Sequence, residues 1–109
     1  MITEHEAERA VRYLHEKAGE AARSRAGHEY LEGMTKVLKA KLSRESNGKT
    51  VGEREDYALA HDDYQRHLEE VRATAELNYE HQNKRKAATA LLDGWRTQEA
   101  SRRGADRAG

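Results

Sequence analysis

The chain lacks cysteine, proline and phenylalanine altogether, and it has few other large apolar residues among its 109. Without cysteine it forms no disulfide bond and no Cys-based zinc site. Leu, Ile, Val and Phe together supply only 14 residues, too few for the core of a stable monomer. We therefore expect further copies of the chain to complete the core.

The sequence also lacks the long apolar stretches that membrane segments require. No stretch is long and apolar enough for a membrane span, and the start "MITEHEAERAVRYLHEK" has no apolar region of the kind found in signal peptides. We expect a protein without a membrane partner.

Alanine and charge are what the chain has in abundance. Its 17 alanines, with no proline, favour long helices. Twenty basic residues balance 20 acidic ones, but residues 82–109 hold seven Lys/Arg against three Asp/Glu. This basic segment is suited to phosphate or to an acidic surface of another subunit.

The first half of the chain has helical periodicity. Thr3 is placed to cap a helix, with Glu6 three residues on. Apolar residues then recur at helical spacing, which predicts one helix over about 4–43. The alternative is two helices broken near Gly27, where the apolar pattern fades.

Turn and capping signals divide the second half. Asn47-Gly48 predicts a turn, Thr50 and Glu53 form a capping box, and Asp62 is placed to cap a further helix. The helices expected here cover about 51–60 and 63–101.

Together these elements predict an all-α fold. Two long helices joined by a turn and a short helix form a single domain over residues 1–101, and residues 102–109 are a flexible basic tail. Neither long helix shows strict apolar heptads, so we expect an irregular bundle, completed by oligomerisation, rather than a simple coiled coil.

Catalytic and metal-binding patterns are weak. His61, Asp63 and His67 form the nearest candidate metal cluster; the alternative is a helix cap with an Asp63–His67 pair four residues apart. No nucleophile elbow or phosphate-binding glycine loop is present. We expect no enzyme, no cofactor and no metal.

An aromatic residue lies among cations in the last helix. Trp95 follows Lys84, Arg85 and Lys86, and cations near an aromatic face are the ingredients of single-strand binding. The alternative, which the apolar spacing favours, is that Trp95 belongs to the core.

The strongest candidate site is the stretch "TKVLKAKLSRESNGK", in which the basic residues are Lys36, Lys39, Lys41, Arg44 and Lys49. With Leu38 at the centre of the buried face, Lys39 lies about 100° to one side and Lys41 about 60° to the other. The two lysines flank the core instead of lining one groove. A strand crossing the helix end, or several subunits presenting copies, would meet both.

Three stretches resemble those of small phage and prophage proteins: "AARSRAGHEYLEGMTKVLKAKL", "YALAHDDYQRHLEEVR" and "AATALLDGWRTQEASRR". The layout of residues 30–100 also resembles the bacteriophage UvsY recombination mediators, which assemble into rings, bind single-stranded DNA and help to load a recombinase. The residue match is "LKAKL", Leu38 to Leu42, where basic residues of that family bind DNA. The resemblance implies phosphate contacts by Lys39 and Lys41.

Two functions follow as expectations. The first is a homo-oligomeric protein of the bacterial cytoplasm that binds single-stranded DNA in phage recombination or replication, with a recombinase or single-strand-binding protein as a further partner. Lys36, Arg44 and Lys49 would support Lys39 and Lys41. The second is a small helical inhibitor or adaptor of a host or phage protein.

Overall fold

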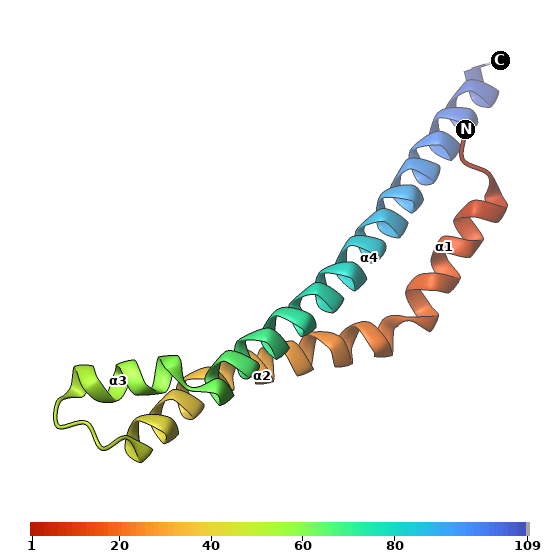
Figure 1. Cartoon of the computed structure of the whole chain (residues 1–109). Helices are drawn as coiled ribbons and strands as arrows, with labels where there is room; N and C mark the ends of the chain where they lie inside the picture. The colour runs from red at the N-terminus through yellow and green to blue at the C-terminus, as the bar shows by residue number, and fades with distance from the viewer. Residues whose placement is uncertain (109) are drawn as a thin grey trace. The chain divides into compact units, whose positions relative to one another are not determined.

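A computed structural model describes residues 1–108 and confirms the all-α class. Within these residues there are four helices and no strand: α1 Glu4–Glu16, α2 Ala18–Glu45, α3 Val51–Ala60 and α4 Asp62–Ala108 (Figure 1). The chain forms two compact units. The first unit joins Met1–Ala22 to the chain from Tyr79 onward, and the second is Arg23–Asn78. The single domain expected over residues 1–101 stays a prediction.

The helix expected over 4–43 is interrupted, and at Lys17 rather than near Gly27. Lys17 has φ −96° and ψ 1°, and its N–H still donates to the carbonyl of Tyr13 at 3.0 Å. Gly27 lies inside α2, where a glycine costs helix stability without ending the helix. The alternative break at Gly27 is therefore wrong as well.

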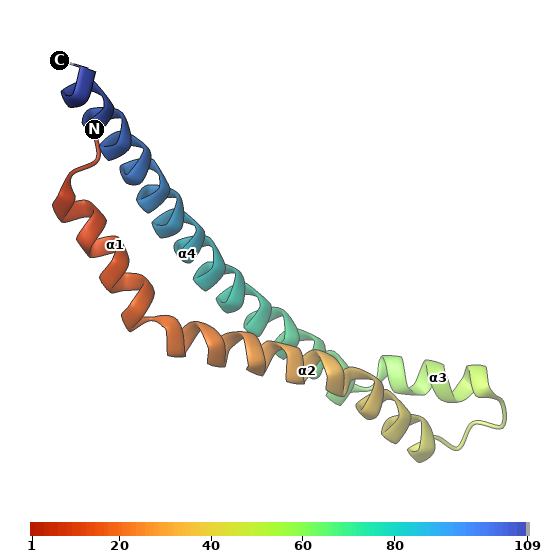
Figure 2. The ribbon, with the colours of Figure 1, turned by 180° about the vertical axis from the view of Figure 1, so that it is seen from behind.

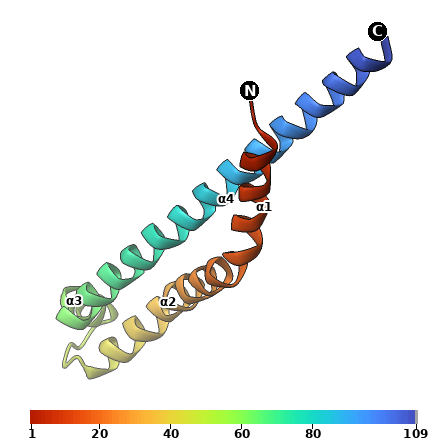
Figure 3. The ribbon, with the colours of Figure 1, turned by 90° about the vertical axis from the view of Figure 1, so that its right-hand side faces the viewer.

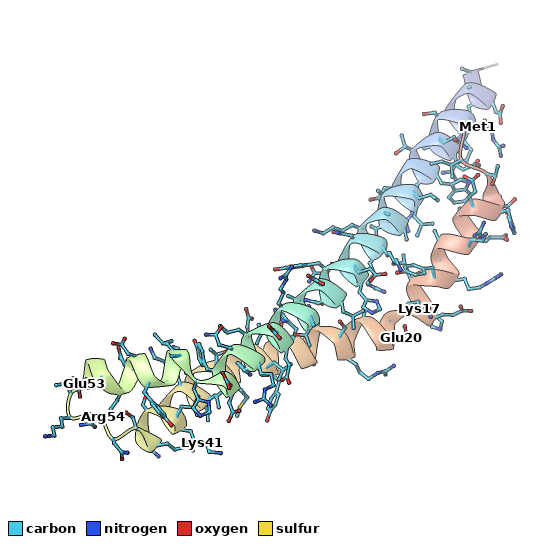
Figure 4. The ribbon with its side chains drawn as sticks, viewed as in Figure 1. Met1, Lys17, Glu20, Lys41, Glu53 and Arg54 are labelled. Carbon is cyan, nitrogen blue, oxygen red and sulfur yellow. The ribbon has the colours of Figure 1, made fainter. Side chains whose placement is uncertain are left out.

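Arg85 of α4 is half-buried and lies beside the end of α1, close to the break at Lys17. Arg85 donates from Nη1 to the carbonyl of Leu14 at 3.1 Å, near the end of α1. Lys17 is turned outward and its Nζ lies 3.6 Å from Glu20 (Figure 4). Arg85 thus supplies a hydrogen bond to a carbonyl near the end of α1, where backbone carbonyls lack partners within the helix.

The buried positions of α4 follow heptad spacing, although its apolar residues do not. Buried and half-buried positions of α4 recur every three and four residues: Tyr64, His67, Val71, Thr74, Asn78, His81, Arg85, Ala88, Leu92, Trp95 and Glu99. This is the spacing of a coiled-coil seam. The apolar residues of the sequence do not reveal this heptad spacing, because the central positions of the seam are His, Thr, Asn and Arg.

In the first unit α1 lies beside the C-terminal part of α4 (Figures 1 and 2). Ala7 and Ala10 pack against Leu92 in a small core, and Trp95 packs against the same cluster. Small alanines let the two helices approach closely. The core interpretation of Trp95 is confirmed.

Gln98 fastens the start of the chain to α4. The backbone N–H of Ile2 donates to Gln98 Oε1 at 3.0 Å, and Gln98 Nε2 donates to the Ile2 carbonyl at 2.7 Å. A Cβ on Gly94 would lie 3.0 Å from Ile2 Cδ1, so the Ile2 side chain packs closely against α4 at this glycine.

In the second unit the middle of α2 and the beginning of α4 lie side by side (Figure 3). His28 Nδ1 lies 3.1 Å from Thr74 Oγ1, and Thr35 Oγ1 lies 2.9 Å from His67 Nε2. The two bonds are one heptad apart on each helix and run in opposite chain directions, so the pairing is antiparallel. Leu42, 2% exposed, fills the seam near the end of α2.

The turn before α3 is formed largely as expected. Thr50 and Glu53 make the predicted capping box. Arg54 Nε donates to the Gly48 carbonyl at 3.1 Å, which ties α3 to the turn (Figure 4). A Cβ on Gly48 would lie 2.8 Å from Glu53 Cβ, so close approach is what requires glycine there.

Both ends of α4 differ from expectation. Asp62 is its first residue rather than its cap, because His61 Nδ1 accepts the N–H of Asp63 at 3.0 Å. The segment 102–109, expected to be a flexible tail, is helical through Ala108. Arg102 pairs with Glu99 at 3.1 Å, and Arg107 in the last turn is favourable at a helix C-terminus. Gly109 lies outside the described residues.

Candidate nucleic-acid interface

The five predicted site residues all belong to the second unit. Lys36, Lys39, Lys41 and Arg44 lie on α2, the last of them in its final turn, and Lys49 lies in the turn before α3. Lys39 is half-buried and the other four are exposed. Lys41 projects from α2 in Figure 4.

None of the five cations forms an ion pair with any residue among 1–108. Elsewhere the same residue types pair with acids three or four positions away, as Arg25 does with Glu29 at 3.2 Å. Glu32 lies four residues before Lys36 and Glu45 four residues after Lys41, but Glu32 approaches His28 instead, at 3.6 Å, and Glu45 forms no ion pair among residues 1–108. The cations between Lys36 and Arg44 therefore remain available to an external anion.

Lys84 in α4, unlike the five candidate cations, forms an ion pair within its own helix, with Glu80. Lys84 Nζ lies 2.8 Å from Glu80 Oε1. This hydrogen bond and the attraction of the two charges lower the pKa of Glu80 and raise the pKa of Lys84. Lys84 is thus engaged within its own helix, so it is a weaker phosphate ligand than an unpaired lysine.

The site residues lie on two faces of α2. Lys41 and Arg44 continue a stripe that begins with Tyr30, Met34 and Val37, with spacings of four, three, four and three residues. Lys36 and Lys39 lie on the other side of the inward face, as Leu38 at the centre requires. The prediction that Lys39 and Lys41 flank the core agrees with the helical character of this segment.

An apolar groove accompanies the first of these faces. Tyr30, Met34, Val37 and Lys41 line a groove of about 310 Å³, together with Leu31, Leu38 and His67. Tyr30 is 67% exposed. The structure therefore places an accessible aromatic ring and a lysine along one groove. Sequence reasoning missed Tyr30; the four-three spacing to Lys41 and Arg44 was the signal that would have found it.

Acidic residues border the site on the other side of the turn. Residues 50–63 contain Arg54 against five acids: Glu53, Glu55, Asp56, Asp62 and Asp63. A polyanion is repelled by α3 and attracted by α2. This separation of charge restricts where a nucleic-acid backbone is able to lie on the second unit.

The candidate metal cluster is not assembled. Asp63 Oδ1 accepts from Arg66 Nη2 at 2.9 Å, and His67 Nε2 is bonded to Thr35. The expected Asp63–His67 pair does not form, because His67 faces the seam. Across residues 1–108 no three His, Asp or Glu side chains are grouped as a metal would require.

None of the helices described here is long and apolar enough to cross a membrane. No protein-family model matches the chain, and searches of curated proteins and of solved structures found no match either.

Proposed function

We propose that the chain is an accessory protein of phage recombination or replication that binds single-stranded DNA as a helical homo-oligomer in the cytoplasm of the bacterial host. The observation that supports it is the set of five unpaired cations between Lys36 and Lys49. A recombinase or a single-strand-binding protein is the partner that the resemblance to recombination mediators implies.

The cations on α2 and the exposed Tyr30 would contact different parts of a DNA strand. Lys39 and Lys41, with Lys36, Arg44 and Lys49 beside them, attract backbone phosphates. Tyr30, exposed in the groove next to Lys41, supplies a ring on which an unpaired base is able to stack. Bases are available for stacking in a single strand and not in a duplex, so the groove favours single strands.

Fluorescence anisotropy with labelled oligo-dT tests the proposal. We expect binding that weakens with salt, with a log–log slope of roughly −0.7 for each phosphate contact. Replacing Lys39 and Lys41 by alanine removes two contacts and flattens the slope by about 1.4. The matched control is Lys84→Ala/Lys86→Ala, which removes the same charge from α4.

The two double variants distinguish specific binding by α2 from a general effect of charge. Equal loss of affinity in both double variants would indicate a general effect of charge and would reject the assignment to α2. An absence of binding at low salt and high protein concentration would reject DNA binding altogether.

A second function is favoured by a different observation. Val37, Leu68 and Leu77 of the second unit are 54%, 40% and 50% exposed. Apolar residues on helices commonly dock onto a partner protein, which fits an inhibitor or adaptor of a host or phage protein. Such a chain would bind no oligonucleotide and would retain its partner after Lys39→Ala/Lys41→Ala.

A further inference from the structure

A second apolar groove lies in the first unit, apart from the candidate DNA-binding residues. It has a volume of about 400 Å³, and its floor is formed by Val11 of α1 with Leu92 and Trp95 of α4. Val11 is 54% exposed although it lies one turn after the buried Ala7 and directly follows the buried Ala10. Covering Val11 and the accessible part of Trp95 would stabilise the unit, because its own core contains few large residues.

Four ionisable side chains border this groove, all from α1: Glu4, Glu8, Arg12 and His15. None of them has an ion-pair partner among residues 1–108. This holds even for Glu8 and Arg12, whose four-residue spacing normally favours pairing within a helix. The acids occupy the N-terminal half of the border and the bases the C-terminal half.

The order of side chains along this face of α1 is complementary to a second, antiparallel copy of the same face. Positions 4, 8, 11 and 15 are spaced by four, three and four residues, so the order of spacings is the same in both directions. Two such stripes therefore match when their helices run antiparallel. In that register Glu4 of one copy meets His15 of the other, and Glu8 meets Val11 with Arg12 beside it. The same patch meets itself, as a two-fold interface requires.

We propose that two copies of the chain associate through this face, α1 against α1 in antiparallel orientation, with Val11 of each copy seated beside Trp95 of the other. The inference rests on the oligomeric part of the proposed function but not on DNA binding, because Lys39 and Lys41 lie in the other unit. A dimer formed in this way carries two DNA-binding units.

Charge reversal tests the interface. Glu8→Arg places like charges opposite Arg12 of the partner, and Arg12→Glu does the same opposite Glu8. We expect each single variant to weaken dimerisation at least tenfold and the double variant Glu8→Arg/Arg12→Glu to restore it. Sedimentation equilibrium of the full chain at up to about 100 µM measures the effect, since a micromolar contact is populated there.

Two further variants make the result specific. Arg9→Glu changes the charge as much as Arg12→Glu does, but Arg9 does not line this groove, so dimerisation should persist. Val11→Asp should give a folded monomer, with helicity checked by circular dichroism. A wild-type chain that is monomeric at about 100 µM overturns the proposal and leaves the groove to a different partner. A double variant that stays monomeric while each single variant is also monomeric overturns the antiparallel register.

The DNA-binding assay separates the two proposals. A monomeric Val11→Asp that still binds oligo-dT supports both, with weaker apparent affinity because it lacks the DNA-binding residues of a second copy. A Lys39→Ala/Lys41→Ala variant that loses DNA binding should remain dimeric. Dimerisation without DNA binding would reject the proposed function and leave this interface standing.

Discussion

His28 Nδ1 and Thr74 Oγ1 form a hydrogen bond of 3.1 Å across the seam of the second unit. Thr74 Oγ1 also lies 2.9 Å from the Val71 carbonyl of its own helix. His28 is 9% exposed, and its Nε2 lies 3.6 Å from Glu32. A buried polar layer of this kind favours one register of two helices, because any shift would leave the imidazole without its hydrogen-bond partner.

The two partners in this layer should respond differently to removal. Thr74→Val leaves the buried Nδ1 of His28 without a hydrogen-bond partner, so we expect a loss of about 1–3 kcal/mol in the free energy of unfolding. His28→Leu should cost less, because Thr74 keeps its bond to Val71. Urea unfolding followed by circular dichroism measures both. Thr97→Val is the control, since Thr97 makes the same bond to its own helix at an exposed site.

Arg85 should contribute more to the free energy of unfolding than its neighbour Lys84. Arg85→Met removes the bond to the Leu14 carbonyl and should lower the free energy of unfolding by about 1–3 kcal/mol. Lys84→Met breaks the pair with Glu80, but both side chains are more than half exposed and solvent screens them. We expect no measurable change for the second variant. Equal losses in thermal or urea unfolding would contradict the role given to Arg85.

Substitution by alanine should change the stability of the chain in opposite directions at two glycines, Gly48 and Gly27. A Cβ on Gly48 would meet Glu53 Cβ at 2.8 Å, so Gly48→Ala should destabilise the chain by about 1–3 kcal/mol. Gly27 lies within α2 with no atom within 4 Å of such a Cβ, and Gly27→Ala should stabilise it by up to about 1 kcal/mol. Melting temperatures of the two variants should therefore move in opposite directions.

Tyr30 and Tyr79 provide a matched pair for base stacking. Both rings are exposed, but only Tyr30 lies in the groove beside Lys41. Tyr30→Ala should weaken oligo-dT binding by about 1–3 kcal/mol, which is roughly 5- to 150-fold. Tyr79→Ala should leave the affinity nearly unchanged. Similar losses in both variants would show that the groove makes no contact with bases.

Much of the secondary structure was predictable, because it depends on neighbours in the chain. The Thr50–Glu53 capping box and the bounds of α3 follow from short-range hydrogen bonds. The exception is the break at Lys17, which no local sequence pattern indicates.

The candidate site was predictable only in part. Lys36, Lys39, Lys41, Arg44 and Lys49 were visible as a cluster of positive charge in the sequence. That they lack ion-pair partners, and that Tyr30 shares a groove with Lys41, depends on side-chain positions across the second unit. Their binding to DNA stays a prediction.

The amino-acid sequence by itself determined that this chain is helical: 17 alanines and no proline stabilise helices through the backbone, whatever the helices pack against. The tertiary structure alone decided which faces are inward. His28, His67 and Asn78 read as surface residues by composition, yet they are among the most buried side chains of the chain. Burial of a polar group is possible only when a partner satisfies it, and for His28 and His67 that partner comes from the opposite helix.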